Sequence, residues 1–132
     1  MSSLVLDSSA MLAILLREPG HEDLLQRIDE ASLVAVGAPT LVETGIVLSS
    51  RLGRDARSLL MDFVRDGEIE VVPFTGDHVA VAIRAFLRFG KGRHRAALNF
   101  GDCLSYAVAG VAGMELVYVG DDFGETDLGS GG

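Results

Sequence analysis

Short aliphatic runs alternate with longer segments of helical periodicity along the chain. The first run, Leu4 to Leu6, is continuous, which is typical of a strand buried on both faces. Four such strands are predicted, over residues 4–6, 32–36, 68–74 and 115–119. Helical segments separate all four, so crossover connections join them and the predicted sheet is parallel. The pattern therefore predicts an α/β fold.

The segments between these strands carry the predicted helices. The segment 11–16 is too apolar to be exposed, whereas 21–30 and 54–65 gather their leucines on one face and are amphipathic. Six helices are predicted in all, over residues 11–16, 21–30, 41–52, 54–65, 77–89 and 100–112. Thr75 and Asn99 precede the last two and are suitable caps for them.

Length and composition limit the classes of protein to which this chain can belong. The 132 residues suffice for one domain with a sizeable core, which we place at residues 1–128, followed by a glycine-rich, disordered tail at 129–132. The single cysteine, Cys103, cannot form an internal disulfide, which fits a reducing cytosol. No apolar run approaches the roughly 20 residues that span a bilayer, and no signal peptide is recognisable. We therefore expect a cytoplasmic protein with no membrane contact.

Hydropathy and charge narrow the range of partners. Hydrophobic residues make up 48% of the chain and the mean hydropathy is +0.34, which is high for a small domain and favours an apolar subunit interface. The net charge of −8 argues against a protein that coats nucleic acid indiscriminately, because such binding depends on excess Lys and Arg. A local basic patch is compatible with this charge.

Acidic residues stand at several joints between strands and helices. Asp7 directly follows the first strand, and Asp121-Asp122 follow the fourth, while Glu43 and Asp102 fall in the first turns of predicted helices. A parallel sheet brings strand ends and helix starts to one edge, where clustered carboxylates repel one another unless a cation neutralises them. Hard oxygen ligands suit Mg²⁺ or Mn²⁺. Such an ion activates water and stabilises phosphoryl displacement, so phosphodiester hydrolysis is the natural chemistry.

Each of these acids also has a purely structural interpretation. Asp7 is a good helix cap. Thr40 and Glu43 have the spacing of a capping box, and Asn99 and Asp102 resemble another. The pair of acids after the fourth strand can form an ordinary polar turn. The pattern alone leaves the capping and the metal-binding interpretations open.

A basic stretch without any acid runs from residue 84 to residue 95. It holds five of the eleven Lys and Arg residues: Arg84, Arg88, Lys91, Arg93 and Arg95. Such a run is often a solvated helix face followed by a flexible loop. Beside an acidic metal centre on an otherwise acidic protein, these side chains are better interpreted as contacts to RNA phosphates.

Four motifs together resemble the PIN-domain ribonucleases, and within them the VapC-type toxins of bacterial toxin–antitoxin pairs. The motifs are Val5-Leu6-Asp7-Ser8-Ser9-Ala10, Pro39-Thr40-Leu41-Val42-Glu43, the stretch from Gly92 to Cys103 with Asn99-Phe100-Gly101-Asp102, and Gly120-Asp121-Asp122-Phe123. The resemblance covers nearly the whole chain. It implies an α/β/α sandwich around a parallel sheet of four or five strands, Mg²⁺- or Mn²⁺-dependent endonucleolytic RNA cleavage, a homodimer and inhibition by a small antitoxin protein.

The resemblance also assigns roles to residues. Asp7, Glu43 and Asp102 match the acidic metal-site positions, with Asp7 and Asp102 as direct ligands, and Ser8 matches a hydroxyl that holds or orients the first acid. The family often carries Asp-x-Asp-Phe after the last inner strand, whereas here Gly120 takes the first position. Asp122 then serves as the fourth acid, aided by Asp121.

Three other interpretations fit the acids less well. A haloacid-dehalogenase-like phosphatase requires a second Asp two residues after the first, where this chain has Ser9. A receiver domain requires a Lys after a late strand, and the only Lys, Lys91, lies in the basic loop. A binding module that keeps the fold without cutting is disfavoured by the intact acids at 7, 43 and 102.

Overall fold

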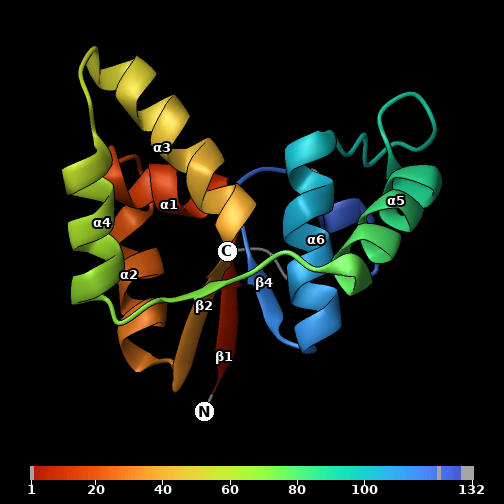
Figure 1. The fold of residues 1–132 in the computed structure, drawn as a ribbon, viewed down its shortest axis with the longest axis horizontal. Helices are drawn as coiled ribbons and strands as arrows, with labels where there is room; N and C mark the ends of the chain where they lie inside the picture. Colours follow the sequence, from red (N-terminus) through yellow and green to blue (C-terminus); the bar gives the residue numbers. More distant parts are fainter. Residues whose placement is uncertain (1, 122, 129–132) are drawn as a thin grey trace.

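A parallel sheet of four strands, in the order β3-β2-β1-β4, forms the centre of the computed structural model, which describes residues 2–121 and 123–128 (Figure 1). The strands are β1 (Ser3–Leu6), β2 (Leu33–Gly37), β3 (Glu70–Val72) and β4 (Glu115–Val117). All three strand pairings are parallel, as predicted. Within the described residues this sheet has no fifth strand. The third strand is shorter than expected, because as an edge strand it pairs only with β2.

In the described part of the chain, six helices connect the strands, as the sequence pattern predicts. They are α1 (Ser8–Leu15), α2 (His21–Glu30), α3 (Ala38–Leu52), α4 (Arg57–Asp66), α5 (Gly76–Phe89) and α6 (Phe100–Ala112), with a short 3₁₀ turn at Phe123–Glu125. Three starts differ from the prediction by three residues. The helix α1 begins early because Asp7 caps it. The helix α3 begins three residues early because Pro39 is accommodated in its first turn, and α4 begins late because Asp55 accepts the backbone N–H of Arg57 and forms its entry turn. None of the helices in the described part of the chain is long and apolar enough to cross a membrane.

Two apolar clusters, one on each face of the sheet, make the fold an α/β/α sandwich, as the resemblance implies. Leu4, Leu6 and Val36 point into the cluster formed with α1 to α4. Val5 and Ala35 point the other way, into the cluster formed with α5 and α6. This alternation is the two-residue period of a strand that is buried on both faces. Figure 1 shows α5 and α6 on the side of the sheet opposite α1 to α4.

The carboxyl edge of the sheet is where the predicted acids gather. The backbone N–H of Asp7, just past β1, donates to the carbonyl of Val117 at the end of β4 (2.9 Å), so these two strands end together. The helix α6 ends at Gly113, directly before β4 begins, and therefore starts at the opposite, carboxyl edge. The starts of α1, α3 and α6 consequently lie at one end of the molecule (Figure 1).

Candidate functional site

Asp7 is buried and held by hydrogen bonds at both carboxylate oxygens. Its Oδ2 accepts the backbone N–H (3.1 Å) and the hydroxyl (2.6 Å) of Ser9, so Asp7 caps α1 as the sequence predicted. Its Oδ1 accepts the hydroxyl of Ser105 on α6 at 2.5 Å. The Ser9 hydroxyl also accepts the N–H of Val119 beyond β4 (2.9 Å). The hydrogen bonds of Ser9 and Ser105 therefore fix the orientation of the Asp7 carboxylate, which connects the end of β1 with α1 and α6.

The hydroxyls that bond to Asp7 are those of Ser9 and Ser105, and the role that the resemblance gives to Ser8 stays a prediction. Among the described residues, the hydrogen bonds to the Asp7 side chain come from Ser9 and Ser105, whereas Ser8 lies by Glu43, whose pKa it lowers. Sequence reasoning missed Ser105, although its position three residues after Asp102 placed it on the same face of the helix.

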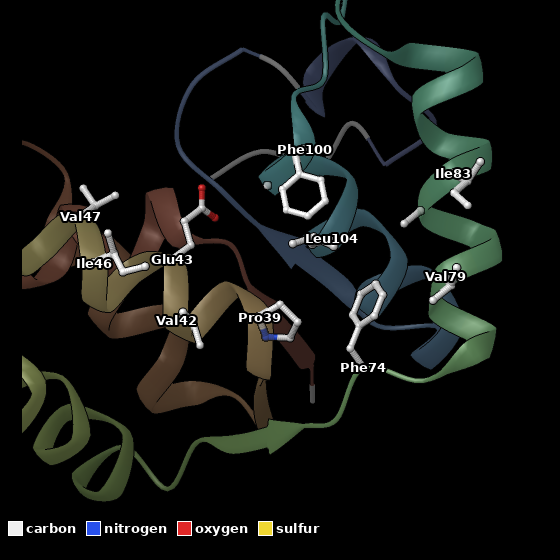
Figure 2. Close-up of a pocket in the computed structure, with 12 residues that line it drawn as sticks. Pro39, Val42, Glu43, Ile46, Val47, Phe74, Val79, Ile83, Phe100 and Leu104 are labelled. Atoms are coloured by element: carbon white, nitrogen blue, oxygen red, sulfur yellow. The ribbon is translucent and has the colours of Figure 1, made fainter.

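Glu43 lies in the second turn of α3, so the expected first-turn position and the capping box with Thr40 are wrong. The helix starts at Ala38, which makes Thr40 an internal residue whose hydroxyl lies 3.3 Å from that of Ser105. The Glu43 carboxylate instead faces the start of α6 (Figure 2). It packs against the backbone of Gly101, where a Cβ would lie 2.5 Å from Oε2.

The electrostatics of Glu43 are unfavourable in the absence of a cation. Its Oε1 is buried with no hydrogen-bond partner among the described residues. Burial, and after it the negative charge of Asp7, raises the pKa of Glu43 above its usual value, while the Ser8 hydrogen bond lowers it. An unpaired buried oxygen is costly unless it finds a partner. A divalent cation between Glu43 and Asp7 would neutralise both charges and satisfy this oxygen.

Asp102 forms the capping box that the sequence suggested. Its Oδ2 accepts the backbone N–H of Asn99 (3.0 Å), and the side chain of Asn99 accepts the N–H of Asp102 (2.9 Å). Asp102 directly follows Gly101, on which Glu43 packs, and stands one helical turn before Ser105, which holds Asp7. The first turn of α6 therefore brings Asp102 to the edge where the other two acids lie.

The described residues do not by themselves complete the predicted metal centre. Within residues 2–121 and 123–128, no group of three or more His, Cys, Asp or Glu side chains is close enough to hold an ion. Asp7 and Glu43 come together, Asp121 is exposed after β4, and Asp122 lies outside the described residues. The roles of Asp102, Asp121 and Asp122 as ligands therefore stay predictions. The donor set that is present, two carboxylates with one orphaned oxygen, fits Mg²⁺ or Mn²⁺.

The predicted basic stretch divides between the end of α5 and the loop before α6. Arg84 and Arg88 lie on α5, and Lys91, Arg93 and Arg95 lie in the loop that leads to Asn99. Two of the five are paired with acids of the segment after β4: Arg88 lies 3.8 Å from Asp127, and Arg95 lies 2.7 Å from Glu125. The loop leads directly into the start of α6, which carries Asp102 (Figure 1).

An apolar groove of about 730 Å³ opens beside Glu43, between α3, α5 and α6 (Figure 2). Among the described residues, Glu43 is the one charged residue that lines it. Several of its apolar side chains are largely exposed: Val42 (61%), Ile46 (65%), Ile83 (56%) and Phe100 (79%). Contiguous exposed apolar surface of this kind is typical of an interaction site rather than of ordinary solvent-facing surface. Some of the hydrophobic residues that make the mean hydropathy high are therefore exposed on this face.

Known proteins resemble this chain over nearly its whole length. A family model described as PIN domain matches residues 4–128. Ribonuclease VapC36 of Mycobacterium tuberculosis is 43% identical over 126 residues, which are 95% of this chain and 91% of that protein. Ribonuclease VapC of Mycolicibacterium smegmatis is 38% identical over 125 residues, or 95% of this chain and 97% of that protein.

Solved structures agree on the fold. The crystal structure of VapC20 of Mycobacterium tuberculosis, a sarcin–ricin loop cleaving toxin, superposes with a TM-score of 0.74 at 22% identity and covers 92% of both chains. A toxin–antitoxin complex from Klebsiella pneumoniae gives a TM-score of 0.69 at 14% identity, covering 96% of this chain and 94% of that one. At these identities the two structures support the architecture alone.

Proposed function

Because the chain belongs to the PIN-domain family and, within it, to the VapC ribonucleases, we propose that it is a metal-dependent endoribonuclease and the toxin of a toxin–antitoxin pair. The observation that carries the proposal is the buried, unpartnered oxygen of Glu43 beside the firmly held carboxylate of Asp7. Without a cation the two neighbouring carboxylates are unfavourable, whereas with a bound cation both can act as ligands. Membership of the PIN family also displaces the phosphatase and receiver-domain interpretations of the acids.

Asp7, Glu43 and Asp102 would hold the ion, which is Mg²⁺ with Mn²⁺ as an alternative, and Asp122, aided by Asp121, would complete the site. When bound, the metal activates water and stabilises the charge that develops on the phosphate. The protein residues supply orientation. Ser9 and Ser105 fix both oxygens of Asp7, and the missing side chain at Gly101 leaves room for the Glu43 carboxylate.

Metal removal should abolish the activity. We expect the purified chain to cleave at least one RNA from a panel of tRNA, rRNA and mRNA in the presence of Mg²⁺, to stop in EDTA, and to resume when excess Mg²⁺ is restored. Labelled substrates resolved by gel electrophoresis give the measurement. A chain that binds these RNAs but cuts none of them with either metal would be a silent binding module, and that outcome would overturn the proposal.

The basic stretch of residues 84–95 is proposed to guide RNA to this site. The net charge of −8 opposes binding over the rest of the surface, so the phosphate contacts should be local. Arg93 has no acidic partner within 4.0 Å among the described residues, whereas Arg95 is already paired with Glu125. Incoming RNA must displace Glu125 to use Arg95, so Arg93 should contribute more.

Replacing both arginines should weaken RNA binding without affecting the metal. For Arg93→Ala with Arg95→Ala we expect lower RNA affinity and a salt slope reduced by about 1.4, from about 0.7 per lost phosphate contact on a single strand. Filter binding from low to moderate salt gives both quantities. The matched control is Arg51→Ala with Arg54→Ala, which removes the same charge at the far end of α3. Equal losses in both double variants would show a general charge effect and contradict a local contact.

We propose that the partners are RNA, a cognate small antitoxin protein and a second copy of this chain, all in the cytoplasm. The apolar groove beside Glu43 is the surface we assign to the second copy. A stable interface buries about 800 Å² on each partner around an apolar core, and exposed side chains of α3 and α5 provide such a core. An antitoxin that blocks the acidic edge would silence the nuclease.

A further inference from the structure

A chain of buried hydroxyls links α3, α6 and the end of β1. The Thr40 hydroxyl lies 3.3 Å from the Ser105 hydroxyl, and Ser105 in turn bonds to Asp7 Oδ1 at 2.5 Å. Thr40 and Ser105 are each only 1% exposed, and Asp7 is 3% exposed. The three side chains therefore interact with one another rather than with solvent.

The donors and acceptors in this chain have a single consistent order. A carboxylate oxygen only accepts, so the one proton of the Ser105 hydroxyl must go to Asp7. The Ser105 oxygen is then left to accept the proton of Thr40. The direction Thr40 to Ser105 to Asp7 follows from valence alone.

The hydroxyl chain also sets how α3 and α6 face each other. Thr40 and Glu43 are three residues apart on α3, and Asp102 and Ser105 are three residues apart on α6, so each pair shares a helix face. Thr40 contacts Ser105. One helical turn away, at the start of α6, Glu43 contacts Gly101. The Thr40–Ser105 contact is polar and directional, whereas Glu43 and Gly101 only approach each other closely. The Thr40–Ser105 contact therefore fixes how Glu43 is positioned relative to Gly101.

The Ser105 hydroxyl does more than fill space, because its acceptor is a buried carboxylate oxygen. A buried acceptor that loses its donor is left unsatisfied, which is costly. We propose that Ser105, backed by Thr40, is a positioning residue for the metal site: it holds Asp7 Oδ1 and keeps α3 and α6 in the register that aims Asp7 and Glu43 at one cation. The inference rests on the proposed metal site and adds residues that lie outside its ring of acids.

The test is Mg²⁺ binding by the purified protein, measured by isothermal titration calorimetry without RNA. Ser105→Ala should lower the Mg²⁺ affinity by about 10- to 100-fold, the usual cost of losing a side chain that orients a metal ligand. Ser105→Thr retains a hydroxyl and should recover most of the affinity. Thr40→Val removes only the outer link and should lose less than Ser105→Ala.

The matched control is Ser49→Ala on α3. Its hydroxyl accepts the backbone N–H of Ala56 at 3.0 Å, so this variant also loses one hydroxyl hydrogen bond, but away from the acids. Ser49→Ala should lower the melting temperature and leave Mg²⁺ affinity unchanged.

A folded Ser105→Ala protein with wild-type Mg²⁺ affinity would overturn the positioning role of Ser105 and leave the proposed metal site standing. A wild-type chain that binds no Mg²⁺ would overturn the proposed metal site itself. If Ser105→Ala does not fold, Thr40→Val decides, and unchanged affinity in that variant overturns the inference.

Discussion

Asp7→Asn should abolish RNA cleavage and the growth arrest that the unrestrained chain is expected to cause in a bacterial host, while the protein still folds. Asn caps a helix about as well as Asp, so α1 should keep its start. The substitution removes one negative charge from the carboxylate pair formed with Glu43. Loss of a single electrostatic group at a reaction centre typically costs 100- to 1,000-fold in rate. We expect a fall of at least about 100-fold in the cleavage rate.

A matched variant separates this effect from loss of a turn. Asp55 also accepts the backbone N–H two residues on, that of Arg57, but it lies at the start of α4. Asp55→Asn should therefore leave cleavage and toxicity unchanged. Circular dichroism confirms folding, and cleavage of labelled RNA together with growth after induction gives the readout. A folded Asp7→Asn protein that cuts at the wild-type rate would reduce Asp7 to a helix cap and remove the foundation of the proposed function.

The sequence was sufficient for the sheet because its two central strands, β1 and β2, are nearly continuous aliphatic runs. Leu4 to Leu6 has no polar face, so it had to be buried on both sides, and helices on both faces of a parallel sheet follow from that. The capping box of Asn99 and Asp102 was equally readable, since its hydrogen bonds join residues three apart. Local spacing and strand periodicity are therefore what the sequence conveys reliably.

The contacts that assemble the site could not be read in this way. Ser105 reaches Asp7 across 98 residues, and only the packing of α6 on the sheet brings them together. The helix α3 was predicted to start at residue 41, after Pro39, although proline is equally at home in the first turn of a helix. The pairing of Arg95 with Glu125 likewise depends on where the segment after β4 lies.

Gly101→Ala should damage the site while leaving the helix sound. Gly101 is the second residue of α6, and alanine is a better helix former than glycine, so α6 itself should tolerate the change. The new Cβ would lie 2.5 Å from Glu43 Oε2 and 2.8 Å from Oε1, distances that real Cβ contacts do not show. The carboxylate must therefore leave its position beside Asp7. We expect Mg²⁺ affinity and cleavage to fall together, by on the order of 10- to 100-fold.

The control for this substitution lies on the same helix. At Gly110 a Cβ would meet its nearest neighbour, Val81 Cγ1, at an ordinary 3.8 Å. Gly110→Ala should raise the melting temperature slightly and leave metal binding and cleavage unchanged. Mg²⁺ titration calorimetry and thermal unfolding of both variants separate the site from the helix. Wild-type Mg²⁺ affinity in a folded Gly101→Ala protein would mean that the Glu43 carboxylate takes no part in holding the ion, because the added methyl group and the carboxylate cannot occupy the same place.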